Sequence, residues 1–310
     1  MNINKPKFWD KKIGVISILF FPLSLIFILI IFFKKKIIKP KVFKIPIICV
    51  GNIYVGGTGK TPTSIFIANK LLELGKNPAI IRKLYNNHSD EYNFIKNYFK
   101  NLIISKNRVI GLRNAEDSGF DSAILDDGLQ DYKVKKSLNI VCFNQNQLIG
   151  NGLVLPAGPL RENLSSLKNA NIIVINGEKN ENFEKLILEI NKNLDIYYST
   201  YKPINLDQFK NKKLLALAGI GNPENFFKLI EENNLKIEKK LIFPDHYKFS
   251  KIEIQNIIAE AESENYEIIM TEKDYYKINS FKLGKINYLK VKLEIKNFQG
   301  LINKINFLYD

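Results

Sequence analysis

The chain has 310 residues, 45% of them hydrophobic, which is enough for one large domain or two of ordinary size with a substantial core. Its 46 Lys and Arg residues outnumber 31 Asp and Glu, giving a formal net charge of +15 at pH 7. This balance favours an anionic partner such as nucleic acid, a membrane surface or a phosphorylated substrate. With only two cysteines and two histidines, a disulfide framework and a histidine-rich metal site are excluded.

Residues 13–33 form an uncharged, almost wholly apolar run of 21 residues with lysines on both sides. Such a run is long enough to cross the hydrocarbon core of a bilayer as a helix. It could instead lie half-inserted in the membrane surface, with the lysines on lipid phosphates, or be a buried core helix. Its length disfavours the core helix, and it is not a typical cleavable signal peptide. We therefore expect a membrane anchor helix over residues 1–40.

A glycine-rich segment joins the apolar run 45–50 to a helical pattern at 63–74. This layout is typical of a phosphate-binding loop, where backbone N–H groups and a lysine surround a phosphate. Tyr54 stands where the usual pattern has glycine. Because ATP is cytosolic, we expect the part of the chain with this loop to be cytosolic too. The expected nucleotide-binding residues are Tyr54, Val55, Gly56, Gly57, Thr58, Gly59, Lys60 and Thr61.

Short apolar runs alternate with helical patterns after the anchor. Strands are expected at 47–50, 79–82, 122–125, 139–143, 172–175, 196–201, 214–218, 236–243, 267–271 and 286–291, and helices at 223–232 and 252–264. Ser250 and Glu253 form the pattern of a capping box before the last helix. The alternation predicts an α/β fold, with a P-loop NTPase-type, mostly parallel sheet flanked by helices over 41–190 and a smaller C-terminal α/β lobe over 191–310.

Two polar segments follow strands in the first lobe. Asp126 and Asp127 end the run 122–125, and in phosphate-loop enzymes such an aspartate holds Mg²⁺ opposite the loop threonine. Adjacent carboxylates cannot both point inward along a regular strand, so we expect one at the metal and the other in a different role. The loop 151–162 has two prolines and two glycines and leads into Arg161, which could point at a phosphate. Both segments would also fit ordinary surface turns.

Together these motifs resemble the tetraacyldisaccharide 4′-kinases, the lipid A 4′-kinases of Gram-negative bacteria. The similar segments occur in the family's order at 50–62, 126–130, 155–162, 218–223, 243–247 and 270–274. The resemblance implies transfer of the ATP γ-phosphate to the 4′-hydroxyl of a membrane-embedded, acylated glucosamine disaccharide 1-phosphate. It also implies Mg²⁺ as cofactor, anionic lipid as a partner and a place on the cytoplasmic face of the bacterial inner membrane. Tyr54 is no departure in this family.

The resemblance also implies roles for single residues. The implied catalytic residues are Asp90, His246, Asp126, Asp127 and Arg161, and the implied metal ligands are Thr61, Asp127 and Glu162. Lys60 is expected on the β- and γ-phosphates, and the pair of Asp90 and His246 on the sugar hydroxyl. The sequence departs from the family in three places. Arg82 alone remains of a Ser-Arg-Gly-Tyr-Gly segment, the stretch before Asp90 is shortened, and Asp131 replaces a histidine.

Two other function classes compete with the kinase. A membrane-associated P-loop ATPase or GTPase switch protein would use the loop, but the segment 271–274 has its lysine one position late for guanine recognition. A non-catalytic basic protein could instead hold lipid or nucleic acid. Neither basic runs interleaved with aromatic residues nor a nucleic-acid recognition motif is evident, so no nucleic-acid partner is expected.

Overall fold

The structure, a computed structural model, describes residues 6–85, 89–244, 247–284 and 286–309. The chain folds into two units. The larger consists of Lys5–Leu84, Phe99–Thr200 and Leu293–Asp310, and the smaller mainly of Tyr85–Tyr98 and Tyr201–Lys292. Each unit is described in turn.

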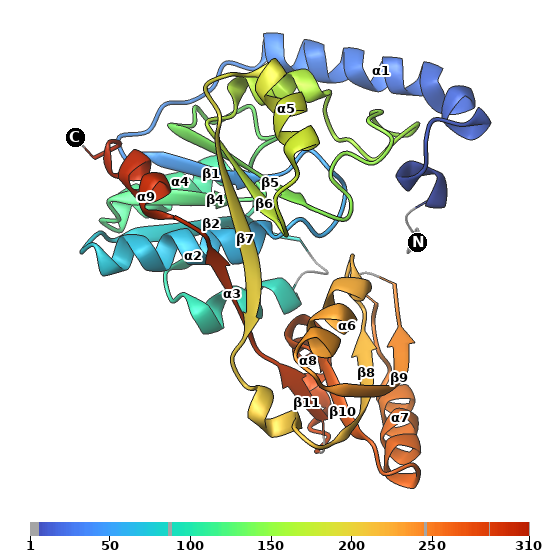
Figure 1. Ribbon diagram of the computed structural model, residues 1–310. Helices are drawn as coiled ribbons and strands as arrows, with labels where there is room; N and C mark the ends of the chain where they lie inside the picture. The colour runs from blue at the N-terminus through green and yellow to red at the C-terminus, as the bar shows by residue number, and fades with distance from the viewer. Residues whose placement is uncertain (1–5, 86–88, 245–246, 285, 310) are drawn as a thin grey trace. The chain divides into compact units, whose positions relative to one another are not determined.

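An eight-stranded sheet forms the centre of the larger unit (Figure 1). Its strands are β1 (Ile47–Gly51), β2 (Pro78–Lys83), β3 (Leu102–Ser105), β4 (Ser122–Asp126), β5 (Leu138–Asn144), β6 (Ile172–Asn176), β7 (Asp195–Pro203) and β12 (Val291–Ile295). Their order is β12-β7-β6-β5-β1-β4-β2-β3, and all pairs from β7 to β3 are parallel. This confirms the predicted P-loop-type α/β fold. The chain runs from β1 to β2, β3 and β4 on one side and then to β5, β6 and β7 on the other. The carboxyl end of β1 is therefore a switch point, where such sheets bind ligands.

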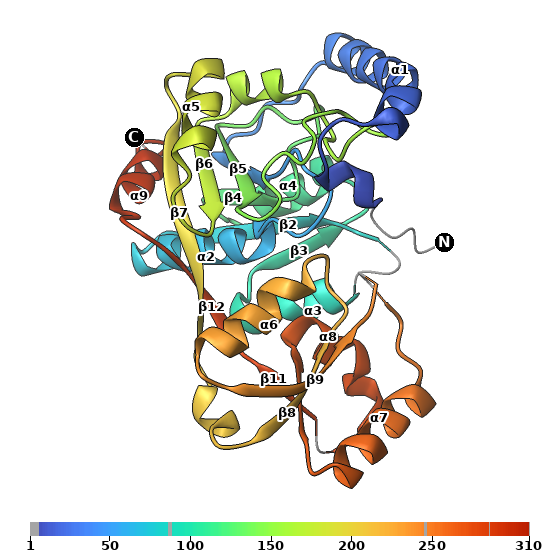
Figure 2. The same cartoon turned by 45° about the vertical axis from the view of Figure 1, so that its right-hand side comes forward.

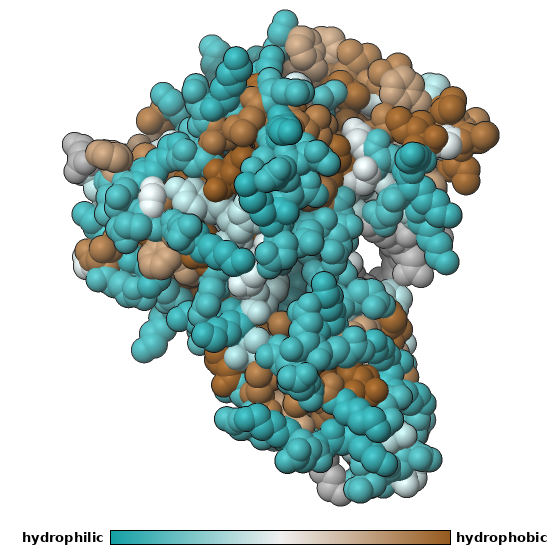
Figure 3. All heavy atoms as spheres, in the orientation of Figure 1, coloured by the Kyte–Doolittle hydropathy of each residue, from teal (hydrophilic) through white to brown (hydrophobic). Residues whose placement is uncertain are grey.

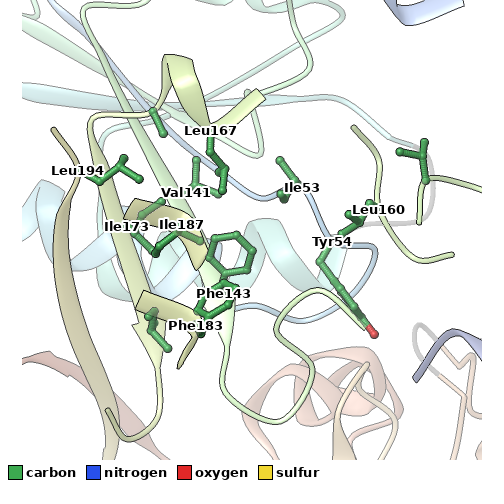
Figure 4. Packing of buried hydrophobic residues seen from close by; sticks show 13 residues of the cluster. Ile53, Tyr54, Val141, Phe143, Leu160, Leu167, Ile173, Phe183, Ile187 and Leu194 are labelled. Atoms are coloured by element: carbon green, nitrogen blue, oxygen red, sulfur yellow. The ribbon is translucent and has the colours of Figure 1, made fainter. Parts of the chain in front are cut away.

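Helices cover both faces of this sheet. They are α2 (Lys60–Glu73), α4 (Arg108–Asp117), α5 (Glu181–Ile190) and α9 (Gln299–Asn306), with 3₁₀ turns η1 (Lys7–Asp10) and η2 (Leu164–Asn169). Helices α2 and α5 lie on opposite faces (Figure 2). Under α5, Phe183 and Ile187 pack on Val141 and Phe143 of β5 (Figure 4). The core strands are buried on both faces, which explains their nearly continuous apolar runs.

The apolar run near the N-terminus forms α1 (Val15–Ile37), long and apolar enough to cross a membrane. Most of its apolar side chains are exposed, and they form a hydrophobic surface along the helix (Figure 3). Its buried residues are Ser17 and Ser24, while Phe27 and Ile28 pack partly against the core. A core helix would bury its apolar face, so the core-helix interpretation is wrong.

A second parallel sheet forms the smaller unit, in the order β11-β10-β8-β9. Its elements are β8 (Lys213–Ala218), β9 (Lys236–Ile242), β10 (Glu267–Thr271), β11 (Ile286–Leu289), α3 (Ser89–Tyr98), α6 (Pro223–Glu232), α7 (Lys251–Ser263) and α8 (Glu272–Ile278), with 3₁₀ turns η3 (Leu206–Phe209) and η4 (Asn279–Phe281). Helices α6 and α7 cover opposite faces of the sheet. The predicted capping box of Ser250 and Glu253 at the start of α7 is confirmed.

The structure differs from the sequence-based elements in three respects. The run 286–291 belongs to two strands, because β11 joins the small sheet and β12 the large one. Several elements have no counterpart among those predicted from the sequence: α3, β3, α4, α5, α8 and α9. The units also cut the chain differently from 41–190 and 191–310: α3 folds with the smaller unit, and residues 293–310 fold with the larger. Apolar periodicity predicts an element but not the sheet that it joins.

Candidate functional site

The phosphate loop lies at the switch point of the large sheet. Strand β1 ends at Gly51, and α2 begins at Lys60, three residues earlier than expected. Gly59 caps α2 with φ 87°, a left-handed conformation that strains any residue with a Cβ. Lys60 and Thr61 therefore stand in the first turn, where free backbone N–H groups attract anions.

Asn52 braces the loop from inside. Its side chain is fully buried, and Nδ2 donates to the carbonyl oxygen of Gly56 (3.3 Å) and to Oγ1 of Thr58 (3.0 Å). Gln130 Nε2 in turn donates to the Asn52 carbonyl oxygen (2.9 Å). Neither residue was among the predicted site residues. The available signal was an amide directly after a strand and before glycines, since an amide can bridge several backbone groups.

Asp126 ends β4 beside β1 and is completely buried. Its carboxylate accepts hydrogen bonds from Thr61 Oγ1 (3.0 Å) and Ser64 Oγ (3.1 Å) of α2. It also forms an ion pair with Arg82, the last residue but one of the neighbouring strand β2, which donates to Thr61 Oγ1 (3.2 Å). The structure thus gives the loop threonine Asp126, rather than Asp127, as its carboxylate partner.

Asp127 points elsewhere because its backbone is left-handed, with φ 54°. Its Oδ1 accepts a hydrogen bond from Arg161 Nη1 (3.0 Å) and lies 3.8 Å from Lys60 Nζ. Its carbonyl oxygen accepts a hydrogen bond from Arg108 Nη2 (2.6 Å). A positive φ at a non-glycine residue is costly and concentrates at functional sites. The adjacent carboxylates of Asp126 and Asp127 therefore serve two different groups of partners.

The charges at the loop leave an excess of cations. Lys60, Arg82, Arg108 and Arg161 pair with Asp126, Asp127 and Asp131. Burial alone would raise the pKa of Asp127, but Lys60, Arg161 and the other cations lower it to about 2. Burial lowers the pKa of Lys60 from its ordinary value, although Asp127 opposes this. Four cations against three carboxylates leave one positive charge that an anionic phosphate can neutralise.

The loop 151–162 is bound to the phosphate loop. Leu160 forms a bridge with Tyr54, and the backbone N–H of Arg161 donates to the carbonyl oxygen of Ile53 (2.6 Å). A Cβ at Gly158 would lie 2.3 Å from the carbonyl oxygen of Leu153, so this close turn requires glycine. These contacts bring the Arg161 guanidinium to Asp127, as a rigid loop leading into an arginine would.

Tyr54, expected at the nucleotide, has its side chain in the protein core. The ring is fully buried in a cluster with Phe143 and Leu160 (Figure 4). Its hydroxyl donates to Asp10 Oδ1 (2.9 Å), and burial raises the pKa of that hydroxyl. Only the backbone of Tyr54 borders the loop, so a large apolar residue is accommodated where other phosphate loops have glycine.

The expected metal ligands Thr61, Asp127 and Glu162 each have a different partner: Thr61 bonds Asp126, and Asp127 pairs with Lys60 and Arg161. Glu162 is buried in an ion pair with Lys35 of α1. Within the described residues, no group of three or more His, Cys, Asp or Glu side chains is placed to hold a metal ion. The pair of Thr61 and Asp126 does supply a hydroxyl and a carboxylate close together. Such oxygens fit Mg²⁺, which keeps several waters and binds phosphates besides.

Of the two expected acceptor-side residues, one belongs to the smaller unit and the other lies outside the described part of the chain. Asp90 lies in the first turn of α3, and His246 lies outside the described residues. Helix α3 is held by α8: Glu91 Oε1 accepts a hydrogen bond from Lys273 Nζ (3.0 Å), and Tyr98 donates to Glu272 Oε2 (2.5 Å).

The segments 218–223 and 270–274 meet in the same unit. Asp274 is completely buried and accepts hydrogen bonds from the Gly219 N–H (2.7 Å) and Lys277 Nζ (2.6 Å). In a GTPase this aspartate would have to face guanine. Instead, Asp274 is buried and bonded to donors of the protein, and Lys273 is paired with Glu91. Both observations argue against the GTPase alternative.

Comparisons with known proteins show the family of the chain. Residues 16–97 and 88–307 match the sequence model of a family described as tetraacyldisaccharide-1-P 4′-kinase. The chain belongs to this family. It is 42% identical over 313 residues to the tetraacyldisaccharide 4′-kinase of Pelagibacter ubique, covering 98% of both chains. It is 35% identical over 324 residues to that of Francisella tularensis subsp. novicida, covering 93% of this chain and 98% of the relative.

The fold of this 4′-kinase family member is also found among solved structures. The crystal structure of LpxK from Aquifex aeolicus, described as an "apo" form in complex with ATP, aligns with a TM-score of 0.71. The alignment covers 96% of this chain and 100% of that one at 22% identity. At this identity the likeness shows the fold, while the sequence relatives show the family.

Proposed function

We propose that this chain transfers the γ-phosphate of ATP to the 4′-hydroxyl of an acylated glucosamine disaccharide 1-phosphate. The product is the 1,4′-bisphosphate, lipid IVA, a precursor of lipid A. The main observation is that Lys60 and Arg161 both form ion pairs with the carboxylate of Asp127 beside the phosphate loop. In a member of the 4′-kinase family, this pair supplies the cations that phosphoryl transfer requires.

On the nucleotide side, the first turn of α2 and Lys60 bind the β- and γ-phosphates. Transfer forms a bond from the 4′-oxygen to the γ-phosphorus and breaks the bridging bond to the β-phosphate, so ADP leaves. Negative charge is spread over the transferring group and the leaving oxygen. Lys60 and Arg161 stabilise that charge because Asp127 already holds both cations at the loop, which lowers the cost of arranging them.

Thr61 and Asp126 are the residues that would hold Mg²⁺. When bound, the ion supplies neutralising charge to the phosphate oxygens. Arg82 fixes the orientation of the Asp126 carboxylate, and Ser64 satisfies its second oxygen. Glu162, in its ion pair with Lys35, holds the end of the loop 151–162 rather than the ion.

On the acceptor side, we assign to Asp90, with His246, the removal of the proton from the 4′-hydroxyl. A carboxylate paired with a histidine is a suitable general base near neutral pH. The ion pair of Glu91 with Lys273, one residue from Asp90, fixes the start of α3 in the smaller unit.

The membrane-associated helix α1 is proposed to lie in the interface of the cytoplasmic leaflet. Ser17, Ser24 and Lys35 all contact the rest of the larger unit, and they span about 27 Å of helix. That length is close to the thickness of the hydrocarbon core, so α1 cannot cross it and keep these contacts. Its exposed apolar side chains would enter the lipid, and the exposed Lys34 and Lys36 would bind anionic headgroups, with no nucleic acid as partner.

Product formation tests the proposal directly. Purified protein with ATP, Mg²⁺ and the acylated disaccharide 1-phosphate should give the bisphosphate, detected by mass spectrometry. Lys60→Ala should lower the rate about 100-fold or more, since a donor to the transferring phosphate is lost. Lys70→Ala, at the other end of α2, is the matched control and should keep the wild-type rate. An unchanged rate in Lys60→Ala would refute the mechanism.

A further inference from the structure

Helix α1 makes its polar contacts with one loop of the larger unit, residues 151–162. We infer that α1 is a positioning element for this loop, and that Ser24 is the residue through which it positions Arg161. The inference rests on the proposed role of Arg161 in phosphoryl transfer, and it gives the membrane helix a second task in the same reaction.

Ser24 is the central contact. It is 1% exposed, whereas its neighbours Leu23 and Leu25 are 51% and 47% exposed. Its Oγ donates to the carbonyl oxygen of Val154 (2.8 Å) and accepts a hydrogen bond from the Ala157 N–H (3.0 Å). A hydroxyl can do both at once, so this one side chain joins the two ends of the turn at 154–157.

Contacts on the N-terminal side extend the attachment. Ser17 Oγ accepts a hydrogen bond from Asn151 Nδ2 (3.2 Å), and the same nitrogen donates to the Ala157 carbonyl oxygen (2.9 Å). Before the helix, Trp9 Nε1 donates to the carbonyl oxygen of Pro156 (3.0 Å). Ser17 and Ser24 are seven residues apart, two helical turns, and so share one face of α1.

Lys35 attaches the other end of the helix. It forms an ion pair with Glu162, whose side chain is 3% exposed, and its Nζ lies 5.1 Å from the ring centroid of Tyr132. A carboxylate as buried as that of Glu162 is stable only when paired, so Lys35 is needed to neutralise it. Arg161 therefore lies between two contacts with α1, one at Ala157 and one at Glu162.

The position of the loop determines where the Arg161 guanidinium lies. The backbone N–H of Arg161 donates to the carbonyl oxygen of Ile53, at the start of the phosphate loop, and Arg161 Nη1 lies 3.0 Å from Asp127 Oδ1. A displacement of about 1 Å in such a group can cost about 100-fold in rate. An anchor alone needs only apolar surface, whereas the inward face of α1 presents hydroxyls to this loop.

The test is a double-mutant cycle between Ser24→Ala and Arg161→Ala, measured as kcat with ATP and the acylated disaccharide 1-phosphate in mixed micelles. Ser24→Ala should lower kcat about tenfold and change the KM for ATP less than about twofold. Because Ser24 acts through Arg161, replacing Ser24 should matter little once Arg161 is gone. The kcat of the double variant should therefore lie within about twofold of the kcat of Arg161→Ala. Ser17→Ala is a second variant, with a smaller loss that is likewise absent once Arg161 is replaced.

Two controls separate positioning from folding and from anchoring. Ser199→Ala removes an equally buried serine of β7 whose hydroxyl has no partner in the described part of the chain, and it should keep wild-type kcat and melting temperature. Ser24→Ala should still sediment with vesicles of phosphatidylethanolamine and phosphatidylglycerol. An unchanged kcat, effects that multiply in the double variant, or a loss of kcat in proportion to lost vesicle binding would each overturn the inference. Failure of wild-type protein to form the bisphosphate would instead refute the proposed function.

Discussion

At the scale of single residues, the site depends on how two adjacent aspartates diverge. The left-handed backbone at Asp127 turns its carboxylate to Lys60 and Arg161, while Asp126 faces Thr61 and Arg82. As expected from the sequence, both Asp126 and Asp127 lie beside the phosphate loop. The assignment of each carboxylate required the backbone dihedral angles, which an Asp-Asp-Gly sequence does not reveal.

The lowered pKa of Lys60 makes nucleotide binding sensitive to alkaline pH. Burial disfavours the charged lysine, so its proton leaves below the ordinary value of 10.5, and bound phosphate would restore it. Affinity for a fluorescent ATP analogue should therefore fall as pH rises from 7 to 10. In Lys60→Arg the charge persists, so that fall should disappear even if the affinity at pH 7 is lower. Parallel pH curves for the two proteins would contradict this account.

At the scale of elements, α3 shows how a helix can fold with a distant part of the chain. It follows β2 of the large sheet, yet its partners are on α8, where Glu272 accepts hydrogen bonds from Tyr98 and Tyr276 (2.9 Å). Burial raises the pKa of Glu272, and the two hydroxyls oppose the shift. The segment 270–274 thus fixes the helix that bears Asp90, a role that its sequence did not suggest.

Removing one of these hydroxyls should loosen α3. Tyr98→Phe leaves the buried Glu272 carboxylate with one donor fewer, so the smaller unit should lose about 1–2 kcal/mol of unfolding free energy. Amide hydrogen exchange over α3 should become faster. In Tyr275→Phe, where the ring packs on Tyr288 and the hydroxyl has no partner among the described residues, both quantities should stay at their wild-type values. Equal losses in the two variants would mean that Glu272 does not hold α3.

At the scale of the whole molecule, the membrane helix and the phosphate loop belong to one unit. The exposed side of α1 is apolar, and its inward side is bonded to the loop beside the site. Sequence left open whether α1 spans the bilayer or lies in its surface. The contacts along its length favour the surface, because a spanning helix would have to give them up.

Cysteine labelling distinguishes the two orientations. Burial raises the pKa of Cys49 to about 11 and that of Cys142 to about 12, so both native thiols should be inert to maleimide. In separate variants, Lys12→Cys and Lys36→Cys, new thiols flank α1. With protein bound to the outside of sealed vesicles, an impermeant maleimide should label both to the same extent. Labelling of only one until the vesicles are opened would show that α1 spans the membrane.

The sequence alone determined the strand–loop–helix with Lys60, the aspartates at the end of β4, the arginine near the end of the loop 151–162 and the apolar helix near the N-terminus. These are local features, since each depends on residues near one another in the chain. Only the tertiary structure decided that Asp126 is the partner of Thr61, that Glu162 pairs with Lys35, that the Tyr54 ring is in the core, and that α3 joins the smaller unit. Each of these depends on which distant segments pack together. Burial of apolar surface and pairing of charges select that packing, whereas the local sequence pattern does not.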